Sequence, residues 1–151
     1  MEKSELKKQF LDECIKIQIQ HLQTLKDEVD EAERIANDNE SGAEENMNSF
    51  REEMQNKREV FTRQFLIANN DLQLLHQIEG KHTFNTVQLG SIVITENQKL
   101  FISVSLGKIN FDGSDWYSIS TQTPLFKVIA GLRAGQSTSF NGKEIKIVDV
   151  F

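Results

Sequence analysis

Apolar residues recur at helical spacing through most of the first half of the chain. Between Ser4 and Asn37, where neither glycine nor proline occurs, they form a heptad seam with one polar member, Gln18. The seam consists of Leu11, Ile15, Gln18, Leu22, Leu25, Val29, Ala32 and Ala36. Ser4 can cap the first turn, because its hydroxyl accepts from free backbone N–H groups. The spacing therefore predicts one long helix.

A second apolar stripe follows a short polar segment. Residues 37–42 combine weak helix formers with Gly42, which predicts a turn. From Glu44 to Ile78 glycine and proline are again absent, and the stripe contains Met47, Phe50, Met54, Phe61, Phe65, Ala68, Leu72 and Leu75. Neither helix could bury its stripe alone. We therefore expect an antiparallel hairpin about 50 Å long.

After Gly80 the pattern changes to one typical of β-strands. β-branched and aromatic runs, together with an Asn141-Gly142 turn signal, predict strands at residues 90–95, 100–106, 116–120, 137–140 and 144–150. Pro124 to Leu132 predicts a short helix with Thr123 as its cap. The predicted fold class is α+β. Residues 1–79 form an antiparallel coiled-coil hairpin with an acidic tip, and residues 80–151 form a small antiparallel β domain with one short helix.

Charge is divided unevenly between the two halves. Residues 1–78 carry 10 basic and 17 acidic side chains, whereas residues 79–151 carry 7 and 6. An acidic helical half disfavours direct binding to a nucleic acid backbone, and it suits a basic protein surface or cations. The single cysteine, Cys14, excludes an intrachain disulfide, and no apolar run is long enough to span a bilayer. We expect a cytoplasmic protein without a signal peptide.

The acidic tip is the main candidate for chemistry. Nine acids and one base, Arg34, lie between Asp27 and Glu45. Folding the hairpin would bring four of the carboxylates together, those of Asp38, Glu40, Glu44 and Glu45. One interpretation is a solvated tip that keeps the hairpin soluble. The other is a carboxylate cluster that completes a Mg²⁺ site belonging to another molecule, because Mg²⁺ accepts one or two protein carboxylates beside water or phosphate.

Enzyme motifs are absent from the sequence. There is no phosphate-binding glycine loop and no nucleophile elbow, and the three histidines are scattered. We expect Cys14 to be a buried, inert thiol, because no histidine lies at a helical spacing from it. The chain is therefore not expected to be an enzyme.

Motifs in the second half follow a familiar order. A Gly90-Ser91-Ile92-Val93 strand comes first, then Ile119-Ser120, Thr123-Pro124 and a short helix ending in Ile129-Ala130-Gly131-Leu132. A hairpin ends the chain. This series resembles the C-terminal domain of the bacterial Gre transcript-cleavage factors, with Thr123 in place of a serine. The helical hairpin with an acidic tip resembles the first half of the same proteins.

The resemblance implies a function. It implies an FKBP-like C-terminal domain that docks on RNA polymerase through the loop at Thr123 and Pro124. The hairpin would enter the secondary channel, where Glu44 and Glu45, with Asp38 and Glu40 as substitutes, would help to hold a Mg²⁺ of the polymerase active site. The polymerase would then cleave backtracked RNA. The chain would be a monomeric accessory factor with no cofactor of its own, in indirect contact with nascent RNA and DNA.

The tip departs from the family pattern. The family sequence is Gly-Asp-Leu-Ser-Glu-Asn, whereas this chain has Gly42-Ala43-Glu44-Glu45-Asn46, one residue shorter. A shift of one residue rotates a helical side chain by about 100°. Two hypotheses therefore stay open, a cleavage factor and a channel-binding regulator without cleavage activity. Two alternatives from other classes are a coiled-coil adaptor or oligomerisation module and a prolyl isomerase.

Overall fold

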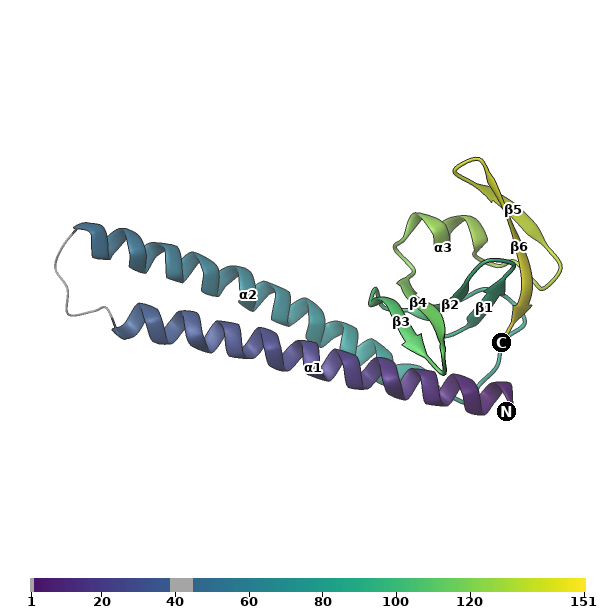
Figure 1. Cartoon of the computed structure of the whole chain (residues 1–151), viewed down its shortest axis with the longest axis horizontal. Helices are drawn as coiled ribbons and strands as arrows, with labels where there is room; N and C mark the ends of the chain where they lie inside the picture. Colours follow the sequence, from purple (N-terminus) through teal and green to yellow (C-terminus); the bar gives the residue numbers. More distant parts are fainter. Residues whose placement is uncertain (1, 39–44) are drawn as a thin grey trace. The chain divides into compact units, whose positions relative to one another are not determined.

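The computed structural model describes residues 2–38 and 45–151, with the side chains of residues 45–48 excepted. The chain begins with two long helices, α1 (Lys3–Asp38) and α2 (Glu45–Gln77), which are followed in sequence by the strands of a sheet and one short helix (Figure 1). The strands are β1 (Ile92–Thr95), β2 (Lys99–Ser103), β3 (Gly107–Phe111), β4 (Ser114–Ser120), β5 (Ser137–Phe140) and β6 (Lys143–Val150), and the short helix is α3 (Pro124–Ile129). The predicted α+β class is confirmed. None of the helices in the described ranges is long and apolar enough to cross a membrane.

The chain divides into two compact units. One comprises Lys16–Gln73, and the other comprises Met1–Ile15 together with Leu74–Phe151. The first turns of α1 and the last turn of α2 therefore belong with the sheet. The domain boundary between residues 79 and 80 stays a prediction.

In the first unit α1 and α2 run antiparallel, as the apolar stripes predict (Figure 1). Leu22 and Leu25 of α1 and Ala68 of α2 are buried in one cluster, and Phe61, Phe65 and Leu72 pack against it. α1 continues through Asn37 and Asp38, where a turn was expected. The rest of that predicted turn, residues 39–42, lies outside the described residues.

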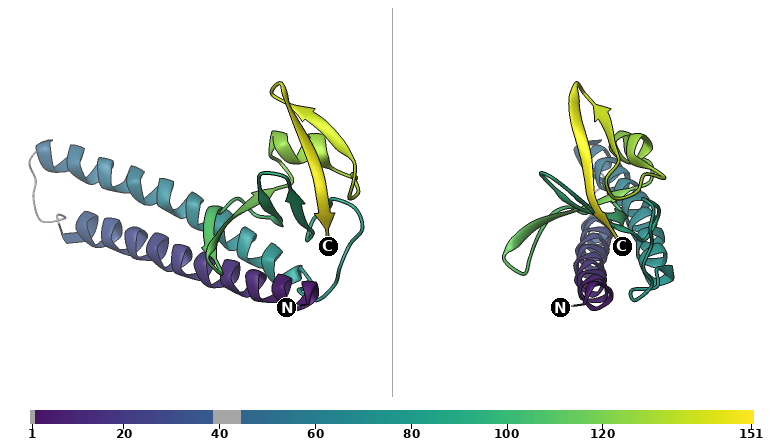
Figure 2. Two further views of the ribbon diagram at one scale, coloured as in Figure 1. Left: turned by 45° about the vertical axis from the view of Figure 1, so that its right-hand side comes forward. Right: turned by 90° about the vertical axis from the view of Figure 1, so that its right-hand side faces the viewer.

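The sheet of the second unit has six strands in the order β3-β4-β2-β1-β6-β5. All neighbours are antiparallel except β2 and β4, which pair in parallel with Leu100 opposite Tyr117. The expectation of a wholly antiparallel sheet is thus wrong for this pair. The cause is β3, an unpredicted strand that lies between β2 and β4 in sequence and pairs with β4 at the sheet edge. Figure 2 shows α3 beside this sheet and the β5–β6 hairpin at one side of it.

Both faces of the sheet are covered. Successive side chains of a strand point to opposite faces, so Leu100 and Ile102 belong to one core, with Ile129 of α3 and Ile147 of β6. Phe101 points the other way and contacts Phe10 of α1, with ring centroids 5.5 Å apart. The start of α1 is therefore part of the fold of the sheet unit.

Candidate functional site

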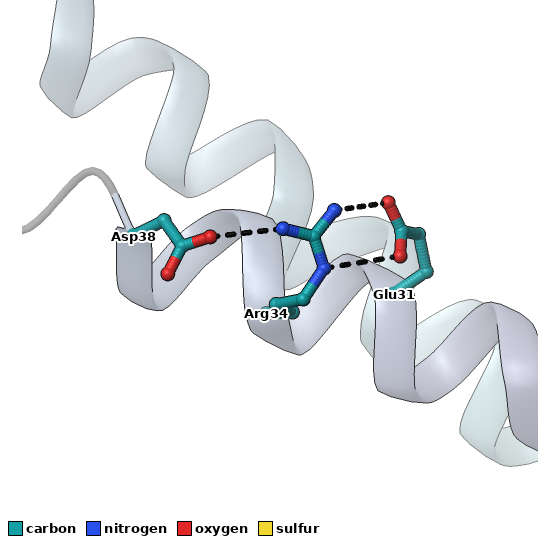
Figure 3. Close-up of polar contacts among 3 residues, drawn as sticks. All are labelled: Glu31, Arg34 and Asp38. Carbon is teal, nitrogen blue, oxygen red and sulfur yellow. Dashed lines mark hydrogen bonds and ion pairs between the residues drawn. The ribbon is translucent and has the colours of Figure 1, made fainter.

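The end of α1 carries an ion-pair chain centred on Arg34 (Figure 3). Its guanidinium donates to Glu31 through Nη2 at 2.6 Å and Nε at 3.2 Å, and to Asp38 through Nη1 at 2.9 Å. The hydrogen bond from Arg34 lowers the pKa of Glu31. All three side chains are more than half exposed. Exposed pairs of this kind contribute little to stability, so a competing ligand could displace them.

The four predicted tip carboxylates are not equally described. Asp38 is the last residue of α1, and its carboxylate is bound by Arg34. Glu45 begins α2, but its side chain lies outside the described residues, as do Glu40 and Glu44 altogether. Among the side chains that the structure describes, no group of three or more His, Cys, Asp or Glu could hold a metal ion. The tip cluster and its Mg²⁺ site stay predictions.

A second ion pair joins the two helices near this end. Arg58 of α2 lies 3.7 Å from the carboxylate of Glu33 on α1. Both border a shallow surface groove of about 430 Å³ that Val29, Glu59, Thr62 and Arg63 also line. Glu31, Glu33 and Asp38 are thus each close to an arginine.

Thr123 and Pro124, the predicted docking loop, form the start of α3. The Thr123 hydroxyl accepts from the backbone N–H of Phe126 at 3.3 Å and donates to the carbonyl of Ser120 at 2.8 Å. Pro124 occupies the first helical turn, where its missing N–H costs nothing, and it is exposed. The predicted cap is confirmed. The helix ends at Ile129, three residues earlier than expected, because Ala130 leaves the helical conformation with ψ at 133° and Gly131 follows with φ at 79°.

Beside this loop lies a groove of about 570 Å³ that sequence patterns did not indicate. Its apolar wall combines Leu125 of α3 with Tyr117, Phe140 and Ile145 from three strands. Its remaining lining is polar and consists of Asn97, Gln98, Asn141, Lys143 and Glu144. The groove depends on sheet topology, so no local signal in the sequence could have revealed it.

Cys14 is buried, as expected. Burial and, to a lesser extent, the negative charge of Glu13 raise the pKa of its thiol, a hydrogen bond with Ser118 opposes them, and together they bring the pKa to about 12. A thiol of this kind is almost entirely protonated near neutral pH. It is therefore not a nucleophile.

The chain has similar proteins among the solved structures. No protein-family model matches the chain, and no curated protein matches it. Among solved structures, the crystal structure of GreA factor homolog 1 (Gfh1) of Thermus thermophilus matches with 17% identity and a TM-score of 0.37, covering 91% of this chain and 94% of that one. A structure of the transcription factor Gfh1 matches with 17% identity and a TM-score of 0.36, covering 90% and 92%.

Proposed function

We propose that the chain is a Gre-like transcription factor that binds RNA polymerase at its secondary channel and promotes cleavage of backtracked RNA. One observation supports this most strongly: the motifs that resemble Gre factors occupy successive elements of one compact unit. Residues 90–93 lead into β1, Ile119 and Ser120 end β4, and Thr123 and Pro124 begin α3. Matching motifs scattered over unrelated elements would not support a shared docking domain.

The charge of the helical unit suits the proposed mechanism. Residues 16–73 contain 7 basic and 13 acidic side chains, and most of the acids lie toward the end of the helix pair. Such a surface repels RNA phosphates but attracts divalent cations. In two-metal phosphoryl chemistry the cations stabilise the attacking and leaving oxygens, so added carboxylates can retain a loosely held Mg²⁺. The chain would supply ligands only, with Mg²⁺ shared with the polymerase and no cofactor of its own.

The proposed setting follows from this role. The factor acts as a monomer in the cytoplasm, with RNA polymerase as its protein partner. Contact with nascent RNA is indirect, through the metal and the polymerase active site. The catalytic groups belong to the polymerase, so the chain is an accessory factor and not an enzyme.

A cleavage assay on stalled, backtracked polymerase complexes tests the proposal. The wild-type protein should shorten the RNA in the presence of Mg²⁺, and the double variant Glu44→Ala/Glu45→Ala should not. The control is Glu52→Ala/Glu53→Ala, which removes the same charge from two adjacent exposed residues further along α2 and should retain activity. If saturating wild-type protein leaves the RNA intact, the cleavage function is excluded.

A second candidate function is a channel-binding regulator without cleavage activity. Two observations favour it: Arg34 binds the Asp38 carboxylate, and Ala43 stands where the family has an aspartate. Such a protein would bind polymerase and lower the rate of RNA synthesis without shortening the transcript. Co-purification with polymerase combined with a negative cleavage assay would select this function.

A further inference from the structure

Gln18 is a buried polar residue in an otherwise apolar helix seam. It is 2% exposed, and its Nε2 donates to the backbone carbonyl of Ala68 on α2 at 2.8 Å. Its Oε1 is buried and has no hydrogen-bond partner among the described residues. A half-satisfied buried amide costs stability, whereas an apolar residue of similar size would not. Gln18 therefore does not serve to stabilise the helix pair.

The residue opposite explains how the amide fits. Ala68 has the smallest side chain of the α2 stripe, so its backbone carbonyl lies within reach of the Gln18 side chain. One heptad away in either direction, the corresponding residue is Phe61 or Leu75. A large side chain there would occupy the space that the amide needs, and the Nε2 group would lose its acceptor in a buried environment. The amide is thus compatible with one alignment of the helices.

Apolar seam residues discriminate poorly between alignments, because they recur every heptad and any large apolar side chain can pack against another. A single polar residue in a seam can select one register at the expense of stability. We propose that Gln18, through its hydrogen bond to Ala68, fixes the register in which α1 and α2 pair. This inference does not depend on the proposed function.

Distance measurements between spin labels test the inference. Labels would be attached to cysteines introduced at Gln23 and Gln64, which are exposed on the two helices, in a Cys14→Ala background. With Gln18 present we expect one distance. In Gln18→Met, which keeps the side-chain length but removes the amide, we expect a second population displaced by about 5 to 10 Å, the axial length of a shift of half a heptad to one heptad. The urea midpoint should rise at the same time.

The control is Gln20→Met, the same change at an exposed position of α1, which should leave one distance. Gln18→Leu repeats the test with a differently shaped side chain. A single unchanged distance in both Gln18 variants would overturn the proposal. Loss of helical circular dichroism in both would overturn it too, because Gln18 would then be needed for stability and not for the choice of register.

Discussion

Phe10 connects α1 to the sheet. Its side chain is fully buried, and its ring contacts three aromatic rings of the second unit, with centroid distances of 5.5 Å to Phe101, 5.2 Å to Phe111 and 5.0 Å to Trp116. If the start of α1 is part of the core of this unit, Phe10→Ala should destabilise the sheet as strongly as any core truncation.

The expected loss is large. Removing a fully buried phenylalanine ring costs about 3 to 5 kcal/mol, through lost burial and the cavity left behind. For a urea dependence of about 2 kcal/mol per molar, the unfolding midpoint should fall by roughly 2 M. Trp116 is the only tryptophan, so its fluorescence reports unfolding of the sheet unit specifically. The midpoint is the quantity to compare, because the substitution also changes the emission of the neighbouring indole.

The control is Phe50→Ala, the same substitution at a ring on α2 that is 37% exposed. It should change the Trp116 transition by less than about 1 kcal/mol. A change equally small in Phe10→Ala would refute the reasoning, since α1 would then rest on the sheet without contributing to its core.

Three further predictions concern single side chains. Burial lowers the pKa of Lys7 from 10.5 to about 8. Between these values the unfolded chain holds a proton that the folded chain has lost, so the unfolding free energy should rise with pH, and Lys7→Met should remove that rise in urea titrations. Cys14, with its raised pKa, should react with a thiol reagent at pH 8 only as the protein unfolds, and rapid labelling of native protein would contradict this. Thr123→Ala should cost about 1 kcal/mol by removing the α3 cap, whereas Thr123→Ser should be nearly neutral by denaturant unfolding.

The long helices were predictable because their signal repeats. Each apolar stripe recurs over many turns, so one polar member such as Gln18 does not obscure it. β3 was missed because Ile109 is its only buried residue, and Gly107 and Asn110 are weak strand formers. The role of Phe10 was hidden as well. Phe10 lies beside the heptad seam. Its partners, Phe101, Phe111 and Trp116, belong to strands that come more than 90 residues later in the sequence.

The candidate site was predictable only where its residues lie on one helix. The acids were visible by count, and helical spacing places Arg34 next to both Glu31 and Asp38, at three and four residues. The pairing of Glu33 with Arg58 needs the register of two helices, which a sequence pattern of seven-residue period leaves open. The groove beside α3 needs the full strand order. Ion pairs within one helix could therefore be inferred, whereas the pairing of Glu33 with Arg58 and the lining of the groove could not.

In the proposed function, docking and tip chemistry rest on separate residues, and this separation decides between the two candidate functions. Pro124→Ala alters an exposed residue of the sheet unit, so it should raise the protein concentration needed for half-maximal RNA cleavage without changing the extent at saturation. Glu44→Ala/Glu45→Ala should do the opposite, leaving polymerase binding intact while cleavage is lost at every concentration. A regulator would show the binding defect of Pro124→Ala and no cleavage even in the wild type. If both variants instead lowered binding and cleavage together, the two units would not have distinct roles. The assignment of docking to the sheet unit and of metal binding to the tip, on which both functions depend, would then be wrong.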